Sequence, residues 1–415
     1  MNKYFTLKET VFEVTTRYPE LIDLFADHGF ENLRNNLLRK TLGKSISVET
    51  ALKSKGFDLQ LFEQKMVDYI ELKKTETAPA STAREEAQEV SPEAVKLAGV
   101  LPCPIRLQFL EHLDGWLKQQ GTPISYDLQA ASMGLDRIQE EIEASTDETN
   151  LADVYLSAGY NLFFDRKLMG RYKERGVFTD LTGVNQLNAH FDNDKIDLKD
   201  PLHQYSIIGV VPAIFMVNTE LLGDRPFPES WADLMHPEFE NTMALPVRDL
   251  DLFNAVLLGI YKKYGADGVA KLGRGLMASM HPAEMVKTGG RKQQEPTPII
   301  TVMPYFFTWM AKTDGPMQAV WPKDGAIISP IFLLSKANSR EKTQPLIDFL
   351  SSKEVGQVLA ADGKFPSTHP EVDNQLDAEK TFLWPGWDFI NNHDIGALLK
   401  ETEDIFYNRK GDDNV

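Results

Sequence analysis

A stretch almost free of large apolar side chains divides this sequence in two. Residues 75–92 read TETAPASTAREEAQEVSP and are rich in Ala, Glu, Ser and Thr. Such a segment cannot bury enough apolar surface to offset the conformational entropy that it would lose on ordering. We therefore predict a flexible linker at residues 75–92, between an N-terminal domain at residues 1–74 and a larger domain at residues 93–415.

The N-terminal domain has the apolar spacing of short helices. Thr6 and Glu9 have the pattern of a capping box, which marks the start of a helix. Apolar residues recur at helical intervals in an early group and a late group, namely Leu7, Val11 and Val14, then Leu59, Phe62, Met66, Tyr69 and Ile70. We predict a small all-α domain of three or four helices without strands.

The larger domain alternates short apolar runs with amphipathic helical patterns. The apolar runs include VKLAGVLP, ADVYLSAG, TMALPV and PIITVMPYFF, and LQFLEHLDGWLKQQG is one of the helical patterns. This alternation is typical of an open α/β sheet. Two longer apolar segments, near residues 205–218 and 320–334, are predicted to cross between the main part of this domain and an inserted part.

Charge and cysteine content exclude several classes of protein. The 415 residues include 44 Lys+Arg and 61 Asp+Glu, and the formal net charge is -17. Because an acidic surface repels phosphates, we expect no nucleic-acid partner. The one cysteine, Cys103, excludes an internal disulfide and a Cys-rich metal cage. We expect no cofactor.

The first residues bear on location. The start reads MNKYFTLKETVFEVTTRYPEL, and charged residues interrupt each of its apolar runs. A secretory signal needs an apolar run of about seven or more residues. Nowhere does the sequence approach the roughly 18 apolar residues of a membrane-spanning helix. We expect a cytoplasmic protein without membrane insertion, and a monomer.

Three segments of the larger domain follow a recognisable pattern. They are VVPAIFMVNTELLGDRPFPESWADLMHPEFENTMALP, WPKDGAIISPIFLLSK and SREKTQPLIDFLSSKEVGQVLAADGKFP. Together they resemble the substrate-binding proteins of ABC transporters, in the iron and small-solute branch of the type II periplasmic-binding fold, over about residues 95–370. The resemblance implies a two-lobed α/β fold with two hinge crossings, in which lobe 1 spans residues 93–206 and 326–415 and lobe 2 spans residues 207–325. It also implies a small-molecule ligand between the lobes and an ABC permease as a partner.

The N-terminal domain carries a second resemblance. RYPELIDLFADHGFENLRN is similar to part of a short helical domain of unknown function, in which paired cysteines usually follow. Here Glu31, Asn32 and Leu33 fill the cysteine positions, so a metal or redox role is not carried over. The resemblance leaves a regulatory or protein-interaction role, with a protein partner for this domain.

The solute site is expected at the carboxyl ends of strands. In open α/β lobes, ligands bind there because the N-termini of the following helices offer free N–H groups. The loops after the four apolar runs supply the candidate ligand-binding residues, which are Cys103, Pro104, Arg106, Ser157, Ala158, Gly159, Arg248, Asp249, Tyr305 and Phe306. Polar groups from separate loops converge only in the folded protein, as in other small-solute sites.

Several of these residues have a structural alternative. Arg106 and Arg248 suit a carboxylate or phosphate, one from each lobe, but either arginine could instead pair with a nearby acid. Ser157 and Gly159 would also suit a tight strand-to-helix turn that binds nothing. Asp249, like Asp251, would more often cap a helix than bind a ligand.

Tyr305 bears on metal binding. In the iron-binding branch, the resemblance implies two adjacent tyrosines as phenolate ligands, but Phe306 follows Tyr305 here. The first-loop histidine of that branch has no match in LPCPIR either. We expect an anionic or organic solute rather than a metal, and keep ferric iron with Tyr305 as a ligand as an alternative. Phe306 and Phe307 could form an aromatic floor under the solute, although such residues more often pack in a core.

Cys103 carries the enzyme alternative. It lies between two prolines, just before a predicted helix whose N-terminus, with Arg106, could favour the thiolate. The sequence places no histidine beside it, and a small buried cysteine is the more common case. We therefore expect a non-catalytic solute-binding protein, acting as a cytoplasmic sensor or buffer, with a Cys103-dependent enzyme as the alternative.

Overall fold

The computed structural model describes residues 4–19, 21–27, 30, 33, 36–55, 57, 59, 62–63, 66–67, 70, 94–120, 123–130, 135–247, 250–279, 297–310, 315–361 and 364–408. The chain divides into two compact units, residues 1–94 with 100–134 and residues 95–99 with 135–415. The predicted linker lies outside the described residues and stays a prediction. Within the described part of the chain, no helix is both long and apolar enough to cross a bilayer.

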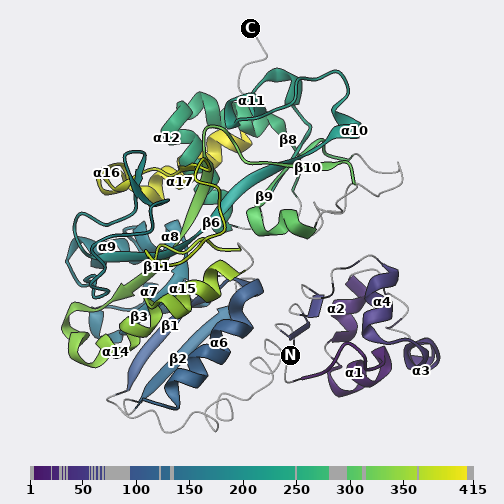
Figure 1. Cartoon of the computed structure of the whole chain (residues 1–415), viewed down its shortest axis with the longest axis horizontal. Helices are drawn as coiled ribbons and strands as arrows, with labels where there is room; N and C mark the ends of the chain where they lie inside the picture. The colour runs from purple at the N-terminus through teal and green to yellow at the C-terminus, as the bar shows by residue number, and fades with distance from the viewer. Residues whose placement is uncertain are drawn as a thin grey trace. The chain divides into compact units, whose positions relative to one another are not determined.

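The N-terminal residues of the first unit are helical, as predicted (Figure 1). The helices include α1 (Val11–Arg17), α2 (Leu21–Asp27), α3 (Asn36–Ser45) and α4 (Val48–Ser54). Their apolar faces share one core, which includes Val14, Phe25, Leu52, Phe62 and Met66. The capping box forms at Thr10 and Glu13, four residues later than predicted, so the first helix begins at Val11.

The first unit also contains helix α6 (Cys103–Leu117) and strand β2 (Ile124–Ala130). Helix α6 begins four residues before the predicted start at Leu107. Pro102 occupies its N-cap position and Pro104 lies in its first turn, where the missing N–H of proline breaks no helical hydrogen bond.

A mixed sheet forms the centre of the larger domain. Its strand order is β2-β1-β3-β11-β6-β9-β7-β8, with β10 on β6 and β12 on β11. The strands are β1 (Val95–Leu101), β3 (Val154–Ala158), β6 (Tyr205–Asn218), β7 (Met243–Leu245), β8 (Leu276–Ser279), β9 (Ile300–Pro304), β10 (Met317–Val320), β11 (Ala326–Ser335) and β12 (Phe382–Leu383). The predicted α/β class is confirmed. The predicted strand through Phe307 is shorter, because β9 ends at Pro304 and a 3-10 helix, Tyr305–Met310, follows.

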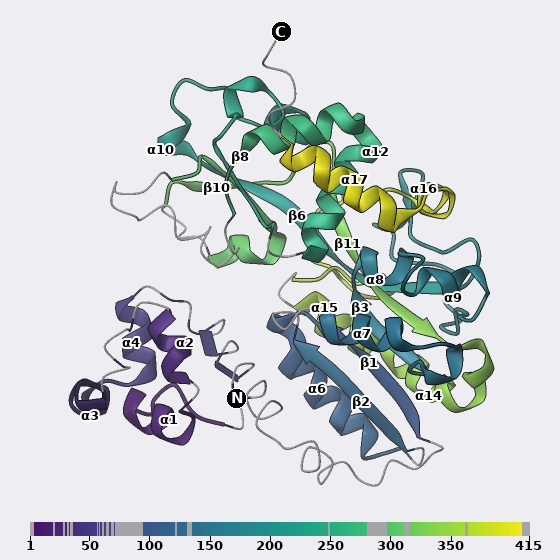
Figure 2. The same cartoon turned by 180° about the vertical axis from the view of Figure 1, so that it is seen from behind.

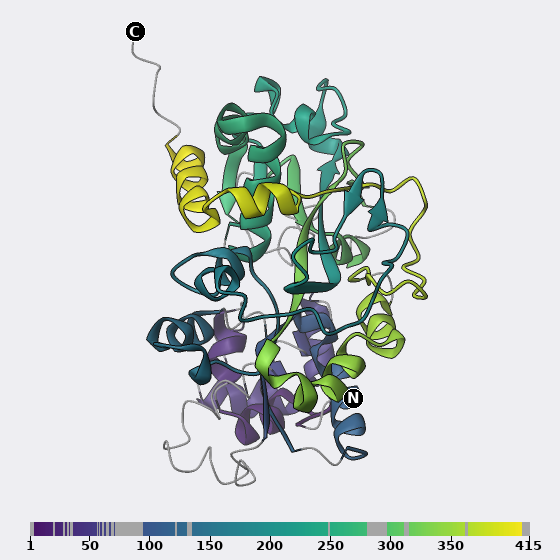
Figure 3. The same cartoon turned by 90° about the vertical axis from the view of Figure 1, so that its left-hand side faces the viewer.

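Two long strands run side by side through the second unit and correspond to the predicted hinge crossings (Figures 1 and 3). The second of them, β11, begins at Ala326, later than the predicted start near residue 320. Strand β6 has 14 residues, a span of roughly 46 Å. Strand β11 pairs with it along most of its own length, from Ile327 opposite Ala213 to Leu334 opposite Tyr205. Strand β3 adds to one half of this pair and β9 to the other half. Each half therefore belongs to a different lobe.

Helices flank the sheet, and the longest of them is α12 (Leu250–Gly275), which is broken at Gly265 (Figure 2). The others in the second unit are α7 (Asp136–Ala144), α8 (Tyr160–Phe164), α9 (Gly170–Glu174), α10 (Thr219–Leu222), α11 (Trp231–Leu234), α14 (Arg340–Leu350), α15 (Lys353–Ala360), α16 (Trp387–Asn392) and α17 (Ile395–Tyr407). Helix α17 packs along α12, with the rings of Phe253 and Phe406 5.0 Å apart. The C-terminal helix, predicted in lobe 1, thus contacts a helix of the predicted lobe 2.

Candidate functional site

The register of the sheet shows that strands β3 and β9 run toward each other along the crossing strands. Strand β3 ends at Ala158, opposite Ile331 on β11, and β9 ends at Pro304, opposite Ala213 on β6. Ala213 is itself paired with Ile327. Ile327 and Ile331 lie four positions apart, roughly 13 Å along β11. Because β3 and β9 run toward each other, the loops after their carboxyl ends face the same short middle stretch of the crossing strands.

Asp251, in the first turn of α12, links this middle stretch to the turn after β3. Its carboxylate accepts a hydrogen bond from the Tyr160 N–H (3.3 Å) and another from the hydroxyl of Ser329. Ser329 is buried on β11 opposite Val211, between the ends of the two facing strands. One carboxylate from the predicted lobe 2 is therefore bonded to a backbone group of the predicted lobe 1 and to a crossing strand.

The turn between β3 and α8 requires a glycine. Gly159 has φ 134°, in the left-handed region that residues with a Cβ rarely adopt. A Cβ there would lie 3.0 Å from the Leu135 side chain and 3.9 Å from Asp251 Oδ1. The positive φ and the short distance to Leu135 would strain a side chain at this position, whereas the distance to Asp251 is that of an ordinary van der Waals contact.

Two other side chains at this turn, those of Ser157 and Tyr160, donate hydrogen bonds to backbone carbonyl groups of strands. Ser157 is buried, and its hydroxyl donates to the Ala158 carbonyl oxygen at 2.8 Å. The phenol of Tyr160 lies 3.5 Å from the Ile328 carbonyl oxygen, to which it donates. Burial, and then the nearby charge of Asp251, raise the pKa of Tyr160, so this phenol stays protonated.

Tyr305 lies in an aromatic cluster directly after β9. Its ring meets Trp321 edge-on, with centroids 5.2 Å apart. The Lys380 Nζ lies 3.5 Å from the Tyr305 hydroxyl and 5.3 Å from the centre of its ring. The ring of Phe306 contacts those of Phe307 and Phe365, with centroids 4.2 Å and 5.1 Å away. Tyr305 and Phe306 remain half-buried at the carboxyl end of β9.

Lys380 is the residue near this loop that the sequence did not predict. It lies in an irregular stretch whose apolar spacing fits neither helix nor strand, and its position depends on the short strand β12, which pairs with the start of β11. The sequence contains no local signal for that pairing.

Three of the predicted ligand-binding residues, Cys103, Pro104 and Arg106, lie at the start of α6 in the first unit. Arg106 is buried on α6, and its Nε donates to the Leu128 carbonyl oxygen on β2 at 3.2 Å. Pro104 is half-buried in the first turn of the same helix. The side chain of Cys103, and all of Arg248 and Asp249, lie outside the described residues.

The donor groups beside Tyr305 do not suit ferric iron. Phe306 has no donor atom, and the Lys380 ammonium, which repels a metal cation, lies beside the Tyr305 hydroxyl. No group of three or more His, Cys, Asp or Glu side chains that could hold a metal ion occurs among the residues placed by the structure. The site offers aromatic rings and an ammonium group after β9, backbone groups after β3 and the Asp251 carboxylate from α12.

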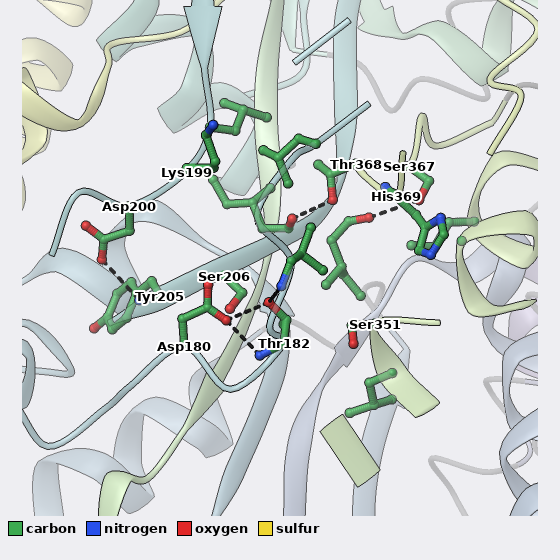
Figure 4. Close-up of a pocket in the computed structure, with 18 of the residues that line it drawn as sticks. Asp180, Thr182, Lys199, Asp200, Tyr205, Ser206, Ser351, Ser367, Thr368 and His369 are labelled. Atoms are coloured by element: carbon green, nitrogen blue, oxygen red, sulfur yellow. Dashed lines mark hydrogen bonds between the residues drawn. The ribbon is translucent and has the colours of Figure 1, made fainter. Parts of the chain in front are cut away.

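A separate small pocket lies beside the first residues of β6 (Figure 4). Ser206, Ser351 and His369 are among the residues that line it. Its cavity volume of about 40 Å³ has room for a water molecule or two and not for an organic solute. The Asp180 carboxylate at its edge already accepts hydrogen bonds from the N–H and the hydroxyl of Thr182. We therefore place the candidate solute site at the crossing strands.

Comparison with known protein families gives two matches. A family described as bacterial extracellular solute-binding protein matches residues 149–393, more than half of the chain. A domain of unknown function (DUF1858) matches residues 5–62. No curated protein sequence matches this chain.

Solved structures with a similar fold include three periplasmic or ferric-binding proteins. The ferric binding protein from Campylobacter jejuni aligns with a TM-score of 0.53 at 14% identity, over 76% of this chain and 99% of that one. The periplasmic binding protein AfuA from Actinobacillus pleuropneumoniae, with fructose-6-phosphate bound, aligns with a TM-score of 0.53 at 15% identity, over 76% and 99%. The apo ferric ion-binding protein A from Pasteurella haemolytica aligns with a TM-score of 0.52 at 13% identity, over 77% and 100%. Identities this low show a shared fold and leave the ligand open.

Proposed function

Because this chain belongs to the family of bacterial extracellular solute-binding proteins, we propose that it binds a small solute reversibly where the loops after β3 and β9 face each other. The observation that carries this proposal is the register of the crossing strands, which aims the carboxyl ends of β3 and β9 at one short stretch of β6 and β11. Ligands of open α/β sheets bind beyond such carboxyl ends.

Binding is proposed to favour a closed arrangement of the lobes through bending of the crossing strands. Pro212 and Pro330 lie in the middle of β6 and β11, paired with Ile328 and Val210. Proline has no N–H to donate to a sheet, so both strands have fewer hydrogen bonds where they pass between lobes. A solute stabilises the closed state only by contacts that the open state lacks, so both loops must contribute.

For the solute, we propose an organic or anionic molecule. Two of the similar structures are named for ferric iron and one has fructose-6-phosphate bound. Ferric iron is the alternative, but the aromatic residue next to Tyr305 is Phe306 and a lysine lies against the Tyr305 hydroxyl. We expect Fe(III) to bind more weakly than an organic anion.

We propose no catalytic step for this protein, in keeping with a family of solute-binding proteins. The alternative, an enzyme that depends on Cys103, predicts a turnover that Cys103→Ser abolishes. A binding protein should retain nearly all of its solute affinity in the Cys103→Ser variant.

Partners and location form a separate proposal. We propose that the N-terminal domain contacts a partner protein, and that the solute is either passed to an ABC permease or sensed in the cytoplasm. The cytoplasmic option is a proposal about where the native protein is found. Fractionation of cells that express the native gene tests it, since recovery in the periplasm would exclude a cytoplasmic role.

A thermal-shift screen tests the binding proposal. The probes are inorganic phosphate, sugar phosphates, dicarboxylates, amino acids, neutral sugars, polyamines and Fe(III). A ligand at about 100 times its Kd should stabilise the folded protein by roughly 2.7 kcal/mol, which is a clear rise in melting temperature. If no class of probe raises the melting temperature, the binding proposal is wrong.

A further inference from the structure

Lys380 lies over the aromatic rings of Tyr305, which follows β9, and Trp321, which follows β10. Its Nζ is 5.3 Å from the ring centres of both Tyr305 and Trp321, and 3.5 Å from the Tyr305 hydroxyl. Aromatic faces attract a cation, more strongly where water is partly excluded. The ammonium group therefore has a preferred place beside the carboxyl end of β9.

The backbone next to Lys380 is held by the second crossing strand. The Thr381 carbonyl oxygen accepts hydrogen bonds from the Ala326 N–H and the Trp321 indole N–H, both at 2.9 Å. Phe382 follows in β12, pairs with Ala326 and packs on Trp321 with centroids 5.4 Å apart. These contacts hold the lysine near the start of β11, on the side of the site that carries Tyr305.

Among the residues that the structure describes, the partner of the Lys380 charge is a weak one. Its ion-pair partner in the structure is Asp377, with Nζ and Oδ2 3.7 Å apart. The Asp377 side chain is 85% exposed, whereas that of Lys380 is 24% exposed. An ion pair with so exposed a carboxylate contributes little, because water and salt screen it. A half-buried ammonium with a weak partner favours an anionic ligand and disfavours a cation.

We propose that Lys380 is a solute-binding residue and that it contacts an anionic group of the solute, a phosphate or a carboxylate. This inference rests on the proposed function, since it needs a solute between the loops after β3 and β9. It specifies that the solute carries a negative charge. It also adds a binding residue that lies outside the loops after β3 and β9.

The test compares the full-length protein with Lys380→Met, which removes the charge but keeps most of the apolar stem, and Lys380→Arg, which keeps the charge. Lys323→Met is the matched control, because Lys323 lies in the same region but its side chain is 69% exposed and pairs with Glu229. Calorimetric titration of each protein uses inorganic phosphate, fructose 6-phosphate, succinate, fructose, spermidine and Fe(III).

The expected result is that the wild type binds at least one of the anionic probes, and that Lys380→Met weakens this binding at least tenfold. Lys380→Arg and Lys323→Met should stay within about threefold of the wild type. Affinity of the wild type should fall as NaCl rises, and this salt dependence should be smaller for Lys380→Met, which a purely structural lysine would not produce.

Two outcomes would overturn the proposal and leave the binding function standing. One is a wild type that binds only neutral or cationic probes, and the other is an anion that Lys380→Met binds as tightly as the wild type. If the wild type binds no probe of any class, the proposed function itself fails, and the role of Lys380 fails with it.

Discussion

The carboxylate of Asp251 accepts a hydrogen bond from the Ser329 hydroxyl, which connects α12 to the middle of the second crossing strand. Ser329 pairs with Val211, and the neighbouring pairs in the register contain the prolines Pro212 and Pro330. The same carboxylate accepts the N–H of Tyr160 from the turn after β3. A solute that enters between the loops would have to coexist with this connection or replace it.

Breaking this connection should destabilise the protein. Asp251→Ala removes a hydrogen-bonded carboxylate and should lower the free energy of unfolding by about 1.5–3 kcal/mol. Ser329→Ala should cost less, because a neutral hydroxyl is lost. Urea unfolding of both single variants and the double variant measures the coupling, which we expect to be at least about 0.5 kcal/mol. Strictly additive losses would show that the two side chains do not interact in solution.

The turn at Gly159 should not tolerate a side chain. Gly159→Ala places a Cβ at φ 134° and 3.0 Å from Leu135, and we expect a loss of about 1–3 kcal/mol in unfolding free energy together with weaker solute binding. Gly115→Ala is the matched control, because Gly115 lies in helix α6 with nothing within 4 Å of the added Cβ. It should stabilise the protein by up to about 1 kcal/mol. Equal effects of the two substitutions would contradict the conformation described for the turn.

Trp231, the first residue of α11, should be essential for the lobe that contains β9. Trp231 is fully buried, its backbone N–H donates to the Asp324 carboxylate at 3.0 Å, and its indole N–H donates to the Gly325 carbonyl oxygen at 2.9 Å. Trp231→Ala should cost about 3–5 kcal/mol and Asp324→Ala about 1–3 kcal/mol. Asp267→Ala, which removes an exposed pair with Lys271, should change stability by less than about 0.5 kcal/mol. Thermal unfolding separates these effects, and a mild Trp231→Ala phenotype would refute the packing.

Asp153 should make stability depend on acidity. Burial alone would raise the pKa of Asp153, but hydrogen bonds from the Lys96 N–H, Ser339 and Lys342 outweigh it and lower the pKa below 3.8. A carboxylate with a lowered pKa stabilises the fold above its unfolded pKa, and this contribution is lost as the pH falls through 3.8 toward the folded value.

The variant Asp153→Asn tests this by urea unfolding between pH 6 and pH 3. The wild type should lose more stability over that range than Asp153→Asn, and Lys342→Met, which removes one of the three hydrogen bonds, should lie between them. If wild type and Asp153→Asn lose stability in parallel, the carboxylate does not have the low pKa assigned to it.

The sequence predicted the crossing strands because each is a long apolar run between polar segments, and β6 begins and ends at the predicted residues. It was less reliable where two local patterns compete. Thr6–Glu9 and Thr10–Glu13 both fit a capping box, and in the structure the second one marks the start of α1. Tyr305 and Phe306 suit a strand by propensity, but the chain turns into a 3-10 helix after Pro304.

The candidate site was predictable to the extent that it depends on strand ends. Gly159 and Tyr305 were predicted as residues that follow strands, and the structure places them after β3 and β9, whose ends face one another. Lys380 could not be predicted, since its position depends on the pairing of β12 with β11, between segments far apart in the sequence. Asp251 was expected to cap a helix, and in the structure its carboxylate accepts hydrogen bonds from Tyr160 and Ser329.

Hydrogen–deuterium exchange of the full-length protein, with and without a solute found by the thermal-shift screen, tests the location of the site most directly. We predict slower exchange in the presence of solute at residues 157–162, at residues 304–308 and in the middle of β6 and β11. Unchanged exchange at these segments, or protection confined to residues 350–369 around the small pocket, would contradict binding between the loops that follow β3 and β9.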